Sequence, residues 1–365
     1  MRISILDPGL SKLAGHFTDL DLRLAGHWAA QGHTVTVHCR KDAPAALDPL
    51  FVNAKAALRR TFTVLSREWL RPGVDNVAPL RLAATAYHQD LLELEAADLV
   101  VWPSASSVCA MAHALCGVTA PAVFGIFEHP GANSAASHGA YAAAREFMRL
   151  RRQKVAWGVY VEDFEPAWSS ILGTGSVQLL PYPTAGRPRL RKPSGPLRIG
   201  FVGALRPERC IDLAVPLIKQ LLDRGFGVTL QDGSNDVPAF SHDRLERFGF
   251  LQDITPVVAA CDLVVWPAQA INYLGRPSGI VAESIACGVP LVMSSACYPS
   301  EMAIKQGSAV FFQRTALNEV LEAVGIAAAQ IGALREKALL CGKRWNRKNG
   351  LQRLADRIFE LAGVS

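Results

Sequence analysis

Glu283 is the residue whose surroundings point most directly to chemistry. It is a carboxylate within the apolar segment SGIVAESIACG at residues 278–288, which follows an apolar run that ends at Pro267. The apolar neighbours predict that the Glu283 side chain is partly buried and has a hydrogen-bonding partner. A carboxylate accepts two hydroxyl donors at once, so it suits the diol of a ribose. It follows the carboxyl end of a predicted strand, which is where open α/β sheets bind nucleotides.

Two arginines are candidates for holding phosphate. Arg206 and Arg209 lie between an apolar run at residues 197–203, which ends in Gly203, and the helical pattern that follows it. A diphosphate needs cations, backbone N–H groups or a helix N-terminus, and a strand–loop–helix junction offers all three. We therefore interpret Gly203, Arg206 and Arg209 as a phosphate-binding segment, with a solvated helix start as the alternative.

The N-terminal half contains further candidate positions. Gly15 stands at the entrance of a predicted helix at residues 16–31, where a missing side chain lets an anion or a sugar reach the helix N-terminus. His129 and Glu128 follow a predicted strand at residues 122–127 and mark its carboxyl edge. A histidine there is a candidate active-site residue, and a structural histidine is the alternative.

The composition is that of a folded protein with excess positive charge. Of the 365 residues, 50% are hydrophobic and 19% are charged, which excludes a disordered chain and supplies two cores. The formal net charge of +6 favours an anionic partner, such as nucleotide phosphates, an acidic glycan or a lipid surface. Ordinary solubility charge is the alternative, and no motif indicates nucleic-acid binding.

The cysteines and the N-terminus indicate where the protein resides. Eight cysteines include no Cys-x-x-Cys pair, so neither zinc nor redox chemistry is indicated, and free thiols suit a reducing cytoplasm. The chain opens on the strand-like RISIL at residues 2–6 rather than on a signal peptide. No apolar stretch reaches the length of about 18 residues that a membrane span needs. We expect a soluble cytoplasmic protein, or one that lies on the inner face of a membrane.

Strands and helices alternate along the chain, which is the pattern of an α/β protein with parallel sheets. In the predicted helix at 16–31, Phe17, Leu20, Leu24 and Trp28 recur on one buried face, and Asp21 lies in its first turns, where the helix dipole favours anions.

A proline-rich stretch divides this alternation into two halves. Residues 181–196 contain five prolines and few core residues, which is a linker composition. The segment ADLVVWP at 97–103 is echoed by ACDLVVWP at 260–267. We expect two Rossmann-like domains with a cleft between them. The expected boundaries are 1–182 for the first domain, 183–196 for the linker, 197–345 for the second domain and 346–365 for a C-terminal helix.

The segment GRPSGIVAESIACGVP at 275–290 resembles the donor-binding signature of retaining glycosyltransferases of the GT-B fold. These are the sucrose-synthase-like family four, where the usual text is roughly EPFGLVLLEAMACGVP. The resemblance implies that Glu283 holds the ribose of a nucleotide-sugar donor. It implies that Ser278 and Gly279 also lie at the donor.

The sequence departs from this family text in the same region. Gly275 replaces a glutamate that touches the donor sugar, so we expect Asn272 or Arg276 to take its place, a different sugar, or poor turnover. Cys297-Tyr298 replaces a glycine pair whose amides contact phosphate and sugar, and side chains there would narrow the approach. Glu301, a few residues after the pair, is retained.

The segment FVGALRPERCIDL at 201–213 resembles the family text FVGRLxxEKGIDL, in which Arg and Lys bind the diphosphate. Arg209 takes the place of the Lys, Ala204 takes the place of the Arg, and Arg206 is the candidate substitute. The family often has a His or Asp near the reacting sugar carbon, which implies a catalytic role for His129, with Glu128 as the second candidate. Many GT-B enzymes also carry glycines near the position of Gly15.

The resemblance implies a metal-independent glycosyltransferase of glycan biosynthesis, and retention of configuration is the family expectation. A nucleotide sugar is the co-substrate, no cofactor is expected, and the acceptor is a glycan, a lipid-linked molecule or a small molecule. In GT-B enzymes the last helix often crosses back onto the first domain. The alternatives are a non-catalytic nucleotide- or glycan-binding homologue and a sugar-nucleotide epimerase.

The basic run REFMRLRRQK at 145–154 is the candidate for a membrane contact. Phe147, Met148 and Leu150 interleave its cations, as in an amphipathic helix that rests on anionic lipid. A solvated face of a surface helix is the alternative.

Overall fold

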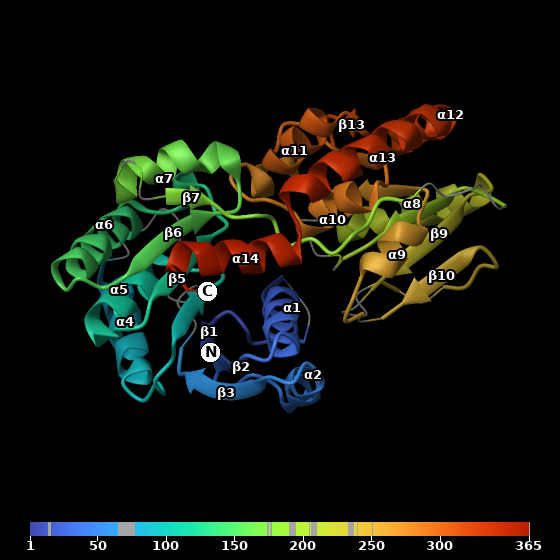
Figure 1. Cartoon of the computed structure of the whole chain (residues 1–365). Coiled ribbons are helices and arrows are strands. Elements are labelled where there is room, and N and C mark those ends of the chain that lie inside the picture. The colour runs from blue at the N-terminus through green and yellow to red at the C-terminus, as the bar shows by residue number, and fades with distance from the viewer. Residues whose placement is uncertain are drawn as a thin grey trace. The chain divides into compact units, whose positions relative to one another are not determined.

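The computed structural model places the chain in two compact units (Figure 1). The first comprises Met1–Pro183 and Leu351–Ser365, and the second comprises Thr184–Gly350. The residues that the structure describes are 1–13, 16–64, 77–173, 175, 177–189, 195–203, 205, 210–232, 237–238, 240–249 and 251–364.

The first unit is built on a seven-stranded parallel sheet. The strand order is β3-β2-β1-β4-β5-β6-β7. The strands are β1 (Arg2–Leu6), β2 (Thr34–Arg40), β3 (Ala57–Phe62), β4 (Leu99–Trp102), β5 (Ala122–Ile126), β6 (Val155–Val159) and β7 (Val177–Leu179). Strands β1, β4 and β5 are buried over almost their whole length, as expected when helices cover both faces of a parallel sheet.

Helices lie on both faces of this sheet. They are α1 (His16–Ala30), α2 (Asp48–Asn53), α4 (Val77–Leu91), α5 (Ser107–Cys116), α6 (Ala135–Leu150), α7 (Glu165–Leu172) and α14 (Leu351–Ala362). The last helix of the chain, α14, packs beside α1 in this unit (Figure 1). Phe359 of α14 stacks on Trp28 of α1 with ring centroids 5.6 Å apart. The His33 ring forms a T-shaped contact with Phe359, with centroids 5.4 Å apart. These ring contacts hold the C-terminal helix on the first unit.

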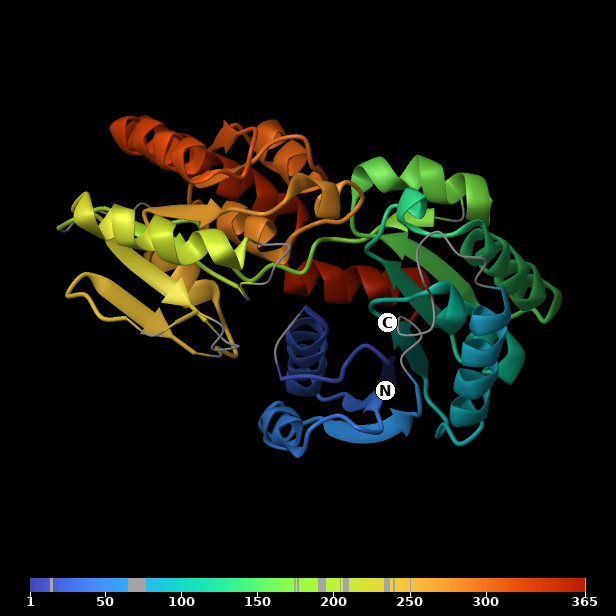
Figure 2. The ribbon, with the colours of Figure 1, turned by 180° about the vertical axis from the view of Figure 1, so that it is seen from behind.

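The second unit is built on a six-stranded parallel sheet in the order β10-β9-β8-β11-β12-β13. Its strands are β8 (Arg198–Phe201), β9 (Gly227–Gln231), β10 (Leu245–Phe248), β11 (Leu263–Trp266), β12 (Leu291–Ser294) and β13 (Ala309–Phe312). Its helices are α8 (Ile211–Asp223), α9 (Thr255–Ala260), α10 (Gly279–Cys287), α11 (Tyr298–Gln306), α12 (Leu317–Ala329) and α13 (Ile331–Lys348). Helices α8 and α12 share one apolar core with one face of the sheet, and Figure 2 shows α8 lying along it.

The predicted fold class is confirmed: both units are Rossmann-like α/β layers with parallel sheets. The run at residues 263–266 is β11, and the predicted helix at 16–31 is α1. Of the apolar run at 289–294, residues Leu291–Ser294 form β12, and Val289 and Pro290 connect this strand to the C-cap of α10 at Gly288. The polar residues 343–348, which carry no apolar pattern, are the end of α13.

The sequence echo marks equivalent places in the two sheets. Strand β4 pairs with β1, and β11 pairs with β8, so each LVVW strand lies beside the first strand of its unit. Asp98, just before β4, accepts a hydrogen bond from the Arg2 N–H at 2.7 Å. Asp262, just before β11, accepts one from the Arg198 N–H at 2.7 Å. Asp98 therefore joins the start of β4 to the start of β1, and Asp262 joins the start of β11 to the start of β8.

No single helix among the described residues is both long and apolar enough to cross a membrane. One pair of segments, 317–329 with 331–362, passes that test together but is bent by 85°. All eight cysteines are free.

The two aspartates provide a matched test of a buried ion pair. Asp262 also pairs with Arg335, and their side chains are only 5% and 11% exposed, whereas the Asp98 side chain is 44% exposed. We expect Asp262→Ala to lower the free energy of unfolding by about 3–5 kcal/mol, because it leaves a buried guanidinium unpaired. Asp98→Ala removes the same type of backbone bond and should cost about 0.5–1.5 kcal/mol. Urea denaturation of both variants measures the difference, and equal losses would contradict the role of the buried pair.

Candidate functional site

The carboxyl edge of the second sheet is the candidate donor site. The strand order reverses between β8 and β11, and open α/β sheets bind ligands at this switch point. Gly203 follows β8 with φ of +88°, a conformation that a side chain would strain. Its N–H donates to the Gln231 side-chain oxygen at the end of β9, at 2.8 Å. Gly203 therefore lies at the switch point, and its part in phosphate binding stays a prediction.

Glu283 lies on α10 and is only 5% exposed. Its Oε1 accepts a hydrogen bond from the Thr255 hydroxyl at 3.0 Å, and its Oε2 accepts one from the Ala185 N–H at 3.3 Å. The sequence predicted a partly buried carboxylate with a partner, and these two groups are partners of it. They hold the carboxylate in one orientation. Binding of a ribose by Glu283 stays a prediction.

The N-terminus of α10 carries no side-chain cap. Ser278 is the N-cap residue, and its side chain makes no capping hydrogen bond. A side-chain carbon added at Gly279 would meet nothing within 4 Å, so the first turn of the helix is open. Exposed Arg276 lies two residues before the N-cap. Uncapped N–H groups at a helix start, with the positive end of the dipole, favour an anion such as phosphate.

The N-terminus of α11 is closed by its own residues. The Cys297 N–H donates to the Ser300 hydroxyl at 3.1 Å, and the Cys297 side chain accepts from the Ser300 backbone, which is a capping box. Pro299 in the first turn has no N–H to offer. The Cys297-Tyr298 departure therefore changes more than the width of the approach, because amides of this helix start are already paired or missing. Glu301 lies exposed in the same turn.

Several predicted site residues lie outside the described part of the chain. These are Arg206, Arg209 and Ala204 in the segment after β8, and Gly15 before α1. Their assignments stay predictions.

His129 and Glu128 follow β5 in the first unit. The Nδ1 of His129 accepts a hydrogen bond from the Gly131 N–H at 3.0 Å, so the neutral ring carries its proton on Nε2. The ring also packs edge-on against Phe164, at 5.0 Å between centroids. The carbonyl of Glu128 accepts from the indole N–H of Trp168 at 2.8 Å. These contacts fix the strand-end loop and orient the imidazole. Catalysis by either residue stays a prediction.

A cluster of buried acids at the carboxyl edge of the first sheet was missed in the sequence. Asp7 follows β1 and is 1% exposed, and Asp21 of α1 is fully buried. Burial, and then the neighbouring Asp7 carboxylate, raise the pKa of Asp21 well above its usual range. Burial and these two carboxylates also raise the pKa of Tyr160, whose hydroxyl donates to the Pro103 carbonyl at 3.0 Å. Asp21 is thus a core group, which its spacing of three residues from Leu24 could have indicated.

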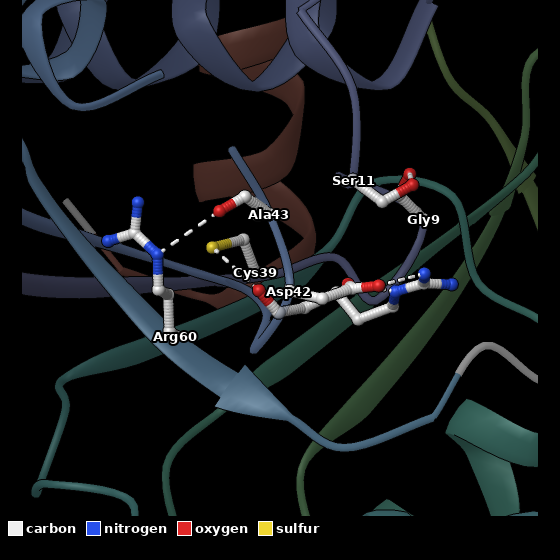
Figure 3. A network of polar contacts seen from close by, with 7 residues as sticks. Gly9, Ser11, Cys39, Asp42, Ala43 and Arg60 are labelled. Carbon is white, nitrogen blue, oxygen red and sulfur yellow. Dashed lines mark hydrogen bonds and ion pairs between the residues drawn. The ribbon is translucent and has the colours of Figure 1, made fainter. Parts of the chain in front are cut away.

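Further polar contacts occur in the loop after β1 and between β3 and the loop after β2 (Figure 3). The Ser11 hydroxyl donates to the Gly9 carbonyl at 3.4 Å. Arg60 of β3 donates to the Ala43 carbonyl at 3.3 Å and so joins this strand to the loop after β2 (Figure 3). The same guanidinium forms two hydrogen bonds with Asp48. The Arg60 bonds hold the loop after β2 and the start of α2 against β3.

The basic run at 145–154 begins within α6. Arg149 pairs with Glu146 one turn earlier, and Arg151 donates to the carbonyls of Ala114 and Leu115 at the end of α5. Phe147 and Leu150 are 44% and 66% exposed. Part of the basic run is therefore used to hold the fold, and a membrane contact stays a prediction.

No group of three or more His, Cys, Asp and Glu side chains that could hold a metal ion occurs among the described residues.

Comparison with known proteins gives matches only among solved structures, since neither a protein-family model nor a curated protein sequence matches the chain. The glycosyltransferase of kitacinnamycin is similar with a TM-score of 0.65 and 16% identity, over 99% of this chain and 98% of that one. Sucrose-phosphate synthase from Thermosynechococcus elongatus is similar with a TM-score of 0.66 and 15% identity, over 99% and 98%. Alr3699/HepE from Anabaena, in complex with UDP, is similar with a TM-score of 0.66 and 15% identity, over 100% of both chains.

The chain has the GT-B fold. At 15% to 16% identity the likeness to these proteins is one of fold. The GT-B fold comprises two Rossmann-like domains, which matches the seven-stranded and six-stranded parallel sheets of this chain.

The raised pKa of Asp21 predicts how stability depends on pH. A carboxyl whose pKa is higher in the folded state than in the unfolded state favours folding when protonated, and this contribution is lost as pH rises through the folded pKa. Asn in this place carries no charge. We therefore expect the melting temperature of Asp21→Asn to rise relative to the unaltered protein as pH goes from about 4 to about 8.

Asp19→Asn is the matched control on the same helix. The Asp19 side chain is 40% exposed and pairs with Arg23 at 2.8 Å. Its variant should show no such gain with rising pH. A flat difference for Asp21→Asn across this range, measured by thermal denaturation, would argue against a buried acid that keeps its proton.

Proposed function

We propose that this protein transfers a sugar from a nucleotide-sugar donor to an acceptor hydroxyl, with retention of configuration and without a metal. The observation that carries the proposal is the placement of the Glu283 carboxylate on α10, whose N-terminus is uncapped at the carboxyl edge of the second sheet. A carboxylate for a ribose diol and a helix start without a side-chain cap for phosphate are the two groups that a nucleoside diphosphate needs.

The similar solved structures support a nucleotide sugar as the donor. These structures include glycosyltransferases and a sucrose-phosphate synthase. Alr3699/HepE is described in complex with UDP and with UDP-glucose. A uridine diphosphate sugar is therefore the first donor to test.

The proposed mechanism divides the work among three sets of groups. Glu283 binds the ribose, while the α10 N-terminus and Arg209, with Arg206 in place of the missing arginine at Ala204, stabilise the leaving diphosphate. Gly203, Ser278, Gly279, Arg276 and Glu301 complete the proposed donor site. His129, whose Nδ1 is held by the Gly131 N–H, offers its Nε2–H to a hydroxyl of the transferred sugar.

The acceptor is proposed only by class. The proposed acceptor is a glycan, a lipid-linked molecule or a small molecule. The proposed location is the cytoplasm or the inner face of a membrane. The exposed Phe147 and Leu150 beside the cations of α6 support the membrane variant.

A second candidate is a homologue that binds nucleotide or glycan without catalysis. The closed N-terminus of α11 favours it, because amides there are paired within the helix instead of facing a ligand. Gly275 favours it as well, because it carries no carboxylate for the donor sugar.

Incubation with a panel of UDP, GDP and ADP sugars tests these candidates. Nucleotide release only in the presence of an acceptor supports transfer. Conversion or release without an acceptor supports an epimerase or a hydrolase, and binding without release supports the non-catalytic homologue.

Replacing the Glu283 carboxylate tests the nucleotide site. Glu283→Gln keeps the shape and loses the charge, so the affinity for UDP should fall by about 1–3 kcal/mol, the range for a hydrogen bond to a charged group. Isothermal titration calorimetry measures it. Glu336→Gln, at an exposed position of α13, should bind UDP normally. Equal UDP affinity of Glu283→Gln and the unaltered protein would reject the ribose contact.

Replacing His129 tests the first unit. His129→Ala should lower kcat while the affinity for UDP stays almost intact, because the proposed imidazole contact forms in the transition state. His242→Ala is the matched control, because the Nδ1 of His242 likewise accepts from the backbone N–H two residues on, at 3.1 Å. Full turnover of His129→Ala, or loss of its fold by circular dichroism, would make His129 a structural residue.

A further inference from the structure

The segment in which the chain enters the second unit is tied to the helices of that unit. We name Thr184–Gly186 the crossing segment, since Thr184 is the first residue of the unit. The Trp345 indole N–H donates to the Thr184 hydroxyl at 3.1 Å. The Asn346 side chain donates to the Gly186 carbonyl at 2.8 Å and to the Ala286 carbonyl at 3.2 Å. The crossing segment is therefore fastened to α13 and to the end of α10.

The crossing segment also lies directly against α10. A side-chain carbon at Gly186 would come within 2.7 Å of the Cys287 sulfur and 2.8 Å of its backbone nitrogen. This is a close approach that only glycine allows. Gly186 thus brings the neighbouring Ala185 N–H next to the helix that carries Glu283.

One carboxylate joins three parts of the second unit. Glu283 belongs to α10, its Oε1 accepts from Thr255 at the start of α9, and its Oε2 accepts from Ala185 in the crossing segment. Burial already limits the rotamers of the Glu283 side chain, and each of these bonds restricts its torsions further. A carboxylate fixed before the ligand arrives binds it at a lower entropic cost.

We propose that Thr255 and the crossing segment position the Glu283 carboxylate, so that nucleotide binding and the hold on the crossing segment are coupled. The inference rests on the proposed nucleotide site. Thr255 is a positioning residue, because it acts through Glu283. Coupling between two binding events is reciprocal, so a ligand that needs the fixed carboxylate must also stabilise the Ala185 bond.

The coupling can be measured by hydrogen exchange of the full chain with and without UDP. In the unaltered protein, UDP should slow exchange of the Ala185 amide several-fold. Glu283→Gln should speed that exchange without any nucleotide, because the glutamine amide has one oxygen where the carboxylate has two.

Thr255→Val tests the positioning residue. It keeps the shape of the side chain and removes the hydroxyl, so the KM for the donor should rise several-fold at nearly unchanged kcat, and UDP should slow Ala185 exchange less. Thr255→Ser should restore both, which a purely structural role of Thr255 would not require. Thr85→Val is the control, because its hydroxyl donates to the Arg81 carbonyl within α4 of the other unit.

Each outcome decides between the two proposals. Binding of UDP, GDP or ADP with unchanged Ala185 exchange overturns the coupling alone. Absence of binding by all three nucleotides overturns the proposed function, and the coupling with it. If Thr255→Val binds UDP as tightly as the unaltered protein, Thr255 is no positioning residue.

Discussion

The pairing of β1 with β4 and of β8 with β11 is the constraint on which the rest of each unit depends. The paired strands are parallel, but from β1 and β8 the chain continues toward one side of the sheet, and from β4 and β11 it continues toward the other. The loops at their carboxyl ends therefore separate, which is where open α/β sheets bind ligands. The pairing starts in the same way in both units, with Asp98 or Asp262 accepting the first N–H of the neighbouring strand. A fixed start sets the register of the pair, and the register sets where Gly203 and the other residues at the carboxyl edge come to lie.

The fold could be predicted because its signals are local. Apolar runs stopped by proline gave β4 and β11, and the apolar stripe of Trp28 and its neighbours gave α1. The partners of Glu283 could not be predicted, because Thr255 and Ala185 lie 28 and 98 residues away along the chain and have no pattern that joins them to it. The capping box of α11 could not be predicted from the sequence for another reason. Cysteine is not among the usual N-cap residues, so only the geometry shows that Cys297 caps this helix.

The two helix starts at the edge of the second sheet differ in what they can offer an anion. At α11, the N–H groups of Cys297 and Ser300 are hydrogen-bonded within the capping box, and Pro299 has no N–H. The start of α10 has no side-chain cap. A diphosphate in this site would therefore depend more on α10 and on cations than a site with two open helix starts. On the proposed function, the departures at Ala204 and at Cys297-Tyr298 would act together, because the resemblance assigns both positions to groups that contact phosphate.

The burial of Glu283 makes its hydrogen bonds to Thr255 and Ala185 and its proposed ribose contact depend on the same side-chain orientation. At 5% exposure, the carboxylate has to exchange water for protein donors, and an unpaired carboxylate at that depth would be costly. Thr255 and Ala185 meet this need in the structure, so the same bonds that make the buried charge tolerable also fix the direction in which it points. A donor site built on such a group cannot be altered independently of the segment that leads into the unit. On the proposed function, the crossing segment therefore takes part in donor binding through the Ala185 bond to Glu283.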